Sequence, residues 1–228
     1  MNIARRLVTS SLGKKFLVAI TGAALFVFVI GHLIGNLQIF LGPEAINRYG
    51  NFLQTTPEIL WPARIGLLAC VIVHIWLSAT LTIENYTARD SRYEVKRVVD
   101  ASLASRTMIW SGLIVFSFVC FHLAHFTLLW IHPEYRNLRY QLGQLEVHDV
   151  YRMMIIGFSN PWVSGFYALS IGLLCLHLGH GIESMFQSLG LKNEVWAARI
   201  NIIGIVVAIL LFVGYVSIPA AVLSGMVK

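Results

Sequence analysis

Histidines carry most of the chemistry that this sequence could support. Six of the eight fall inside long apolar segments: His32, His74, His122, His125, His177 and His180. An ionisable group inside a membrane-spanning segment is costly, so its presence is evidence for a function there. A neutral imidazole is a common nitrogen ligand for metals. A single intramembrane histidine could also be an interhelical hydrogen-bonding residue, so the distribution of all six must decide.

The cysteines offer no competing chemistry. Cys70, Cys120 and Cys175 lie in apolar segments, and an odd, lipid-buried set does not indicate a disulfide framework. The sequence contains no CxxCH motif for covalent c-type haem. No carboxylate or thiolate is placed to complete a metal shell with His122 and His125. Small apolar packing is the expected role of the thiols.

The histidines must be positioned by five apolar segments. The chain is 57% hydrophobic and 12% charged, whereas soluble domains are about one quarter charged. We expect an all-α membrane protein, one domain over residues 1–228, with five transmembrane helices in one bundle. A span needs about 20 apolar residues, which gives helices at about 16–41, 61–83, 107–131, 161–186 and 198–223. The first run is too long for a signal peptide. Pro161 favours a helix start, and Pro219 a kink or end.

The basic residues predict the orientation. Eleven Lys and Arg residues lie on the side of the N-terminus and of the connection 84–106, and six lie on the other side. Because basic loops stay in the cytoplasm, the N-terminus is expected inside and the C-terminus outside. The setting is then the lipid bilayer of the inner (cytoplasmic) membrane. No basic stripe alternates with aromatic residues, so no nucleic-acid partner is expected. The connection 84–106 could also dock a cytoplasmic protein.

The histidines fall at two depths. His32 lies 17 residues beyond Lys15, and His122 lies 16 beyond Arg106. His74 lies ten residues before Glu84, and His177 ten before Gln187. At about 1.5 Å per residue the two levels are roughly 10 Å apart. One histidine from each of two helices at one depth suits bis-histidine haem, so His32 is expected to pair with His122, and His74 with His177.

The remaining polar residues of the spans are expected to support these ligands. His125 and His180 lie about a turn from the paired histidines and are interpreted as hydrogen-bonding or packing residues. A ligand histidine needs a partner for its other ring nitrogen, which backbone carbonyls or Ser78 could provide. Small residues near His177 (Ser170, Gly181 and Ser184) could leave room for a flat macrocycle or mark ordinary helix contacts.

Four motifs in this order resemble one known family. They are FVIGHLIGN, VIVHIWLSA, FVCFHLAHF and LCLHLGHGIES, and the segment GPEAINRYGNFLQTTP follows the first. From about Lys14 to Val222 the chain resembles the five-helix, di-haem cytochrome b subunit of succinate dehydrogenase and fumarate reductase, respiratory complex II. In that family the first-helix histidine pairs with the third and the second with the fourth, in agreement with the depth count.

The resemblance implies two haem b groups and two cytoplasmic partners, a flavoprotein and an iron–sulfur protein. The chain would be the electron-transfer subunit of succinate:quinone oxidoreductase, a tricarboxylic acid cycle enzyme, and would itself hold no succinate-binding residue. Electrons would pass from the inner haem (His74, His177) to the outer haem (His32, His122) and then to a quinone, expected to be menaquinone. Whole complexes could associate into a higher oligomer.

Quinone reduction takes up protons, so a polar group is expected near the outer haem. Glu44 is the first candidate, with Gln54 and Arg64 behind it. The alternative for Glu44 is a solvated carboxylate beside Arg48.

Three other functions stay open. One is the cytochrome b subunit of another membrane oxidoreductase, of hydrogenase or nitrate reductase type. Another is a transporter that uses the histidines as a proton relay, although no Asp or Glu lies in mid-membrane to alternate with them. The last is a haem-free membrane anchor.

Overall fold

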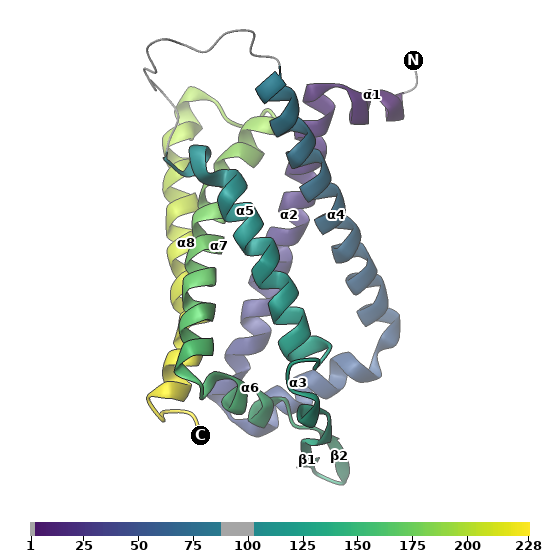
Figure 1. The fold of residues 1–228 in the computed structure, drawn as a ribbon, viewed down its shortest axis with the longest axis vertical. Helices are drawn as coiled ribbons and strands as arrows, with labels where there is room; N and C mark the ends of the chain where they lie inside the picture. The colour runs from purple at the N-terminus through teal and green to yellow at the C-terminus, as the bar shows by residue number, and fades with distance from the viewer. Residues whose placement is uncertain (1–2, 88–102) are drawn as a thin grey trace.

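The computed structural model describes residues 3–87 and 103–228, which form a bundle of long helices (Figure 1). Within these residues, five segments are long and apolar enough to span a membrane. They are α2 (Ser11–Asn36) with the short helix η1 (Leu37–Leu41), α4 (Pro57–Thr87), α5 (Leu103–His122) with the π-helix η2 (Leu123–Thr127), α7 (Pro161–Ser188) and α8 (Glu194–Leu223). The prediction of a multi-pass helical membrane protein is confirmed.

Side-chain caps fix where the helices begin. The Ser10 Oγ accepts a hydrogen bond from the Gly13 N–H at the start of α2. Asn160 caps α7, directly before Pro161 in the first turn, as the sequence predicts. Asn193 caps α8 in the same way. These side-chain oxygens satisfy N–H groups that the first turn of a helix leaves without partners.

Pro219 does not end the fifth helix. A proline inside a helix removes one backbone hydrogen bond and crowds the preceding turn. Nevertheless α8 continues to Leu223, four residues further. Ile218, Pro219, Ala221 and Val222 are all buried there. Of the kink or end expected at Pro219, the end does not occur, and the helix ends at Leu223 as in the predicted range 198–223. Packing of the last turn against the bundle outweighs the lost bond.

The helices pack unequally. α2 packs against α4 and α7, and α7 also packs against α5 and α8. Within the described part of the chain, α2 and α5 make few close backbone approaches, and the same holds for α4 and α7. These two helix pairs face each other mainly through side chains, and they are the pairs that carry the facing histidines.

One end of the bundle carries structure that the spans alone do not predict. It comprises α3 (Pro43–Thr55), the short helix η3 (Pro133–Asn137), α6 (Val150–Phe158) and a hairpin of β1 (Arg139–Leu142) and β2 (Leu145–His148). The strands pair antiparallel, with Arg139 opposite His148. We call this set the hairpin cap. The C-terminal end of α8 lies beside it, whereas α1 (Ile3–Thr9) lies at the opposite end of the bundle (Figure 1).

The surface of the bundle suits a lipid environment. Leu77 is the one fully buried residue of α4, and most of its large apolar side chains are exposed. Five exposed tryptophans lie near the ends of the spans: Trp61, Trp130 and Trp162 toward the hairpin cap, and Trp110 and Trp196 toward the other end. The sixth, Trp76, is exposed inside α4. Tryptophan is enriched at membrane–water interfaces, so the two groups indicate the two membrane surfaces.

Candidate functional site: two levels of paired histidines

The pair nearer the hairpin cap is His32 on α2 and His122 on α5. Their ring centres are 5.7 Å apart and the rings are nearly perpendicular, at 81°. Two imidazoles on one metal ion, each about 2 Å from it, would have ring centres roughly 6 Å apart. The two rings are therefore close to the separation that a shared metal would impose. Phe28 stacks on His32 with ring centres 5.3 Å apart.

The pair nearer the α1 end begins with His74 on α4, whose hydrogen bonds define its tautomer. Its Nδ1 lies 3.2 Å from the Val18 carbonyl oxygen and 3.2 Å from the Thr21 Oγ. A carbonyl oxygen can only accept, so the proton is on Nδ1. The Thr21 hydroxyl donates its own proton to the Leu17 carbonyl, at 2.8 Å. The lone pair of His74 is therefore on Nε2, the nitrogen available to a metal.

His177 on α7 repeats this arrangement. Its Nδ1 lies 3.3 Å from the Ser111 Oγ on α5, and the Ser111 hydroxyl donates to the Met108 carbonyl at 3.0 Å. The Ser111 oxygen therefore accepts from the Nδ1–H, and Nε2 again keeps the lone pair. A metal-ligating histidine typically donates its other N–H in this way, which fixes the ring and raises its basicity.

The residues around these two histidines leave space beside the rings. Thr21 and Ser111, which contact His74 and His177, lie eleven residues before the facing His32 and His122, so the rings of His74 and His177 lie at one level. A Cβ on Gly22 would be 3.1 Å from the Cε1 of His74, and a Cβ on Gly112 would be 3.7 Å from that of His177. The four paired histidines are all half-buried, and no fully buried side-chain nitrogen or oxygen of the described residues lacks a hydrogen bond. The free Nε2 atoms therefore face accessible space.

These residues fit a haem, which takes axial ligands from two facing histidines. Within residues 3–87 and 103–228, no group of three or more His, Cys, Asp and Glu lies close enough together to hold a metal ion alone. A metal held by protein ligands only usually needs three or four of them. A two-histidine set instead suits a metal whose remaining ligands come from a macrocycle.

His125 and His180 are engaged differently. His125 lies in the π-helix η2, is 1% exposed and stacks on Phe126, with ring centres 4.0 Å apart. Its Nδ1 lies 3.0 Å from the Tyr167 hydroxyl. His180 has its Nε2 within 3.2 Å of the Ser184 Oγ, one turn along α7. These contacts support the hydrogen-bonding role expected for both.

Thr21, Ser111 and Tyr167 are site residues that the sequence reading missed. Thr21 lies 11 residues before His32 and Ser111 lies 11 before His122. Eleven residues are about three helical turns, so each hydroxyl shares a helix face with an outer histidine. This repeated spacing was the available signal. Of the two partners expected for a ligand nitrogen, backbone carbonyls or Ser78, the structure gives His74 a backbone carbonyl, that of Val18, together with the Thr21 hydroxyl. Ser78 contributes its carbonyl to a bond from Thr82.

The hydroxyl contact to His74 also bears on the separation of the two levels. Thr21, which contacts His74, lies eleven residues before His32 on α2, a helical rise of about 16 Å. The charged boundaries of α2 and α4 lie at one depth, since Lys14 and Glu84 form a salt bridge. The separation of roughly 10 Å counted from these boundaries stays a prediction.

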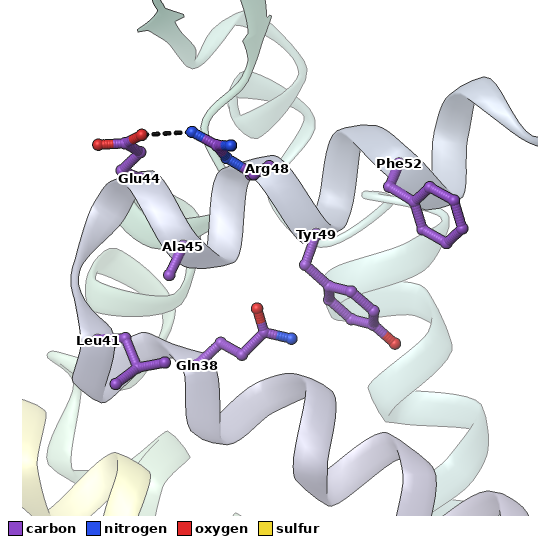
Figure 2. Close-up of a pocket in the computed structure, with 7 residues that line it drawn as sticks. All are labelled: Gln38, Leu41, Glu44, Ala45, Arg48, Tyr49 and Phe52. Carbon is purple, nitrogen blue, oxygen red and sulfur yellow. Dashed lines mark hydrogen bonds and ion pairs between the residues drawn. The ribbon is translucent and has the colours of Figure 1, made fainter.

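A groove of about 700 Å³ lies between η1 and α3 in the hairpin cap. Its lining includes Gln38, Glu44, Arg48, Tyr49 and Phe52 (Figure 2). A Cβ on Gly35 would be 2.6 Å from the Tyr49 ring, so this ring lies against α2 one turn beyond His32. The groove is open along one side rather than an enclosed cavity.

The three polar residues suggested for a quinone are not brought together. Glu44 lines the groove and pairs with Arg48 at 2.5 Å, with both side chains mostly exposed, which favours the alternative of a solvated carboxylate. Gln54 is exposed near the end of α3. Arg64 lies over the Trp61 ring on α4, 5.4 Å from its centre. Gln38 and Tyr49 are additional polar groups of the groove, and Figure 2 shows both extending into the space between the two segments.

The case for this site rests on the geometry of its own residues. Comparison of the chain with models of protein families, with curated proteins and with solved structures finds no match.

Proposed function

We propose that this chain is a di-haem cytochrome b subunit of the succinate dehydrogenase and fumarate reductase type. It would connect a cytoplasmic flavoprotein and iron–sulfur protein to a quinone in the inner membrane. The observation that carries the proposal is the pairing of histidines at two levels on facing helices. At the level of His74 and His177, both Nδ1–H groups are held by hydroxyl or carbonyl oxygens, so both Nε2 atoms are available.

Each part of the chain has a defined task in this proposal. His32 and His122 would hold one haem, and His74 and His177 the other; bound haem supplies one-electron redox chemistry. Thr21 and Ser111 orient the inner ligands from neighbouring helices. The exposed apolar helix faces keep the pairs in lipid.

Haem content of the purified protein tests this proposal. We expect two haem b per chain in reduced-minus-oxidised spectra and a pyridine haemochrome assay. His122→Ala and His177→Ala should each remove one low-spin signal. His125→Ala should keep both, and His148→Ala, in the hairpin cap, is a control outside both pairs. A wild-type protein without b-type haem would refute the proposal, and loss of haem from His125→Ala but not from His122→Ala would reverse the assignment on α5.

The groove between η1 and α3 is the proposed contact for the quinone head group. Gln38 and Tyr49 offer hydrogen-bond donors there, and Glu44 lies at its edge. Gln38→Ala and Tyr49→Phe should raise the KM for quinone and leave both haems in place. Gln54→Ala is the matched control, because Gln54 is an exposed amide on α3, the helix of Tyr49. An equal effect of all three changes would place the quinone elsewhere.

The soluble partners distinguish this proposal from a hydrogenase or nitrate reductase cytochrome. Paired histidine ligands suit the haems of all these cytochromes, so the ligand geometry alone does not separate the two functions. We expect the chain to co-purify from native membranes with a flavoprotein and an iron–sulfur protein, and the complex to show succinate:quinone activity. Co-purification with a nickel or molybdenum enzyme would support the alternative.

A further inference from the structure

Tyr167 stands between His122 at the end of α5 and His125 in η2. It is buried on α7, and its hydroxyl lies 3.0 Å from the Nδ1 of His125 and 3.4 Å from the Nδ1 of His122. A phenol has one proton to donate and an oxygen that can accept. If both Nδ1 atoms carried protons, the phenolic proton would be buried without an acceptor, at a cost of about 1–3 kcal/mol. The favoured arrangement has the hydroxyl accepting from one histidine and donating to the other.

This arrangement makes the two histidines complementary. The one that donates its Nδ1–H to Tyr167 keeps its lone pair on Nε2 and can bind a metal. The one that accepts from Tyr167 carries its proton on Nε2 and cannot. Tyr167 therefore permits only one ligand from the pair at a time.

The surroundings select His122 as that ligand. His122 faces the His32 ring across the helix pair. His125 is fully buried and stacked on Phe126, and a Cβ on Gly157 would already be 2.7 Å from the Phe126 ring. No room is left for a macrocycle beside His125.

We propose that Tyr167 is a positioning residue of the outer haem site, which assigns the ligand role to His122 by accepting its Nδ1–H and donating to His125. The inference rests on the proposed function, because it concerns a haem held by His32 and His122. An acceptor on Nδ1–H strengthens a histidine ligand, and the ligand field tunes the haem potential. Tyr167 therefore holds the outer potential lower than His122 alone would set it.

The test is Tyr167→Phe in the assembled, haem-loaded protein, with redox titration and low-temperature electron paramagnetic resonance of each haem. We expect two haems per chain, an outer midpoint potential shifted to more positive values, an altered outer low-spin signal and an unchanged inner haem. Tyr215→Phe is the matched control. Tyr215 is another phenol beside the outer pair, with its ring centre 6.3 Å from that of His32, but its hydroxyl donates to the Val29 carbonyl at 2.7 Å. It should leave both haems unchanged.

Two outcomes of this experiment would overturn the inference directly. An unchanged outer haem in Tyr167→Phe would do so, and so would an equal shift in Tyr215→Phe.

If Tyr167→Phe loses the outer haem altogether, His125→Phe decides. The His125→Phe variant keeps an aromatic ring stacked on Phe126 but removes the nitrogen that accepts the Tyr167 proton. Without that bond, the Tyr167 oxygen is a weaker acceptor for the Nδ1–H of His122. A smaller shift of the same sign supports the inference and no shift overturns it. A wild-type protein without haem would instead refute the proposed function and the inference with it.

Discussion

Asn47 is the polar side chain on which the hairpin cap depends most directly. It is 0% exposed, donates from Nδ2 to the Asp149 carboxylate at 3.0 Å and accepts from the Tyr151 N–H at 3.0 Å. Asp149 in turn caps α6 by accepting from the Arg152 N–H. One amide thus links α3 to the first turn of α6, 102 to 104 residues later in the chain.

Asn47→Ala should therefore destabilise the cap without removing haem. The change leaves the buried Asp149 carboxylate and the half-buried Tyr151 N–H short of one partner each. Hydrogen bonds to charged groups contribute about 1.5–3 kcal/mol. We expect the free energy of unfolding in detergent to fall by about 2–3 kcal/mol, with haem content unchanged. Asn51→Ala, one turn later on α3 and only half-buried, is the control. Equal losses in both variants would contradict the role of Asn47.

His148 makes the hairpin cap sensitive to acid. Burial lowers the pKa of its imidazole below the ordinary 6.5, and the charge of Arg139 acts in the same direction, whereas the Leu138 carbonyl and the Asp149 carboxylate oppose it. Because the folded state has the lower pKa, the unfolded state binds more protons between the two values, so stability rises with pH in that window.

We therefore expect the hairpin to open more readily as the pH falls from about 7 toward 5.5, a range around the ordinary pKa of histidine. Hydrogen exchange at the β1 and β2 amides, corrected for intrinsic rates, measures this opening. His148→Gln should remove the dependence. A slope that is equal in the variant and the wild type would assign the effect to another group.

At the scale of elements, Lys14 and Glu84 join α2 to α4 at the α1 end. They form a salt bridge in which the lysine side chain is 6% exposed and the glutamate 44%. Their burial is unequal, so the two partners are not equivalent. Without Lys14, the carboxylate remains in contact with water. Without Glu84, a charged ammonium is left buried and unpaired.

Glu84→Gln should consequently destabilise the protein more than Lys14→Met. Removing one partner of a buried ion pair, so that the other charge stays buried and unpaired, lowers the free energy of unfolding by up to about 3–5 kcal/mol. Because Glu84 is half-exposed, we expect the loss in Glu84→Gln to lie at the lower end of this range. For Lys14→Met the loss should be about 1 kcal/mol or less, as for exposed pairs. Thermal unfolding of the two variants side by side measures the order, and the reverse order would contradict this account.

Gly22 tests whether α2 and α4 must approach closely at the inner histidines. An added methyl would lie 3.1 Å from the His74 ring, so that ring must move by a few tenths of an ångström. Gly22→Ala should alter the spectrum or reduce the occupancy of the inner haem. Gly31→Ala, beside His32, adds a methyl with no atom within 4 Å and should have no effect. A change of haem spectrum or occupancy in Gly31→Ala, with none in Gly22→Ala, would contradict this account.

The elements that the sequence predicted well are those defined by apolar length. The five spans follow from runs of about 20 apolar residues, which need no knowledge of their neighbours. The hairpin cap was missed because its helices are short and its strands have four residues each. Such segments are held by distant partners, as α3 and α6 are by Asn47 and Asp149, and local patterns do not contain those contacts.

The candidate site shows the same division between what local patterns predict and what contacts between helices decide. The levels of His32 with His122 and of His74 with His177 follow from counting along helices, since helical rise is constant. The roles of Thr21, Ser111 and Tyr167 depend on which face of one helix meets which face of another.

At the scale of the whole molecule, the odd number of spans puts α1 and the C-terminal end of α8 at opposite ends of the bundle (Figure 1). The proposed function requires a particular orientation, because the inner histidines must lie nearer the soluble partners. The α1 end is nearer His74 and His177 and carries Lys14, Lys15, Lys192 and Arg199. A basic excess of this kind marks the cytoplasmic side.

Labelling of single introduced cysteines with a membrane-impermeant maleimide tests this orientation. Gln144→Cys lies exposed at the tip of the hairpin, and Leu191→Cys lies exposed in the connection between α7 and α8. In intact spheroplasts we expect Gln144→Cys to label and Leu191→Cys to remain unlabelled until the membrane is permeabilised. The native thiols serve as the background control, since all three lie within the spans. Labelling of Leu191→Cys from outside would show the opposite orientation, with His32 and His122 nearer the cytoplasm. The path from cytoplasmic partners through His74 and His177, on which the proposed function depends, would then not exist.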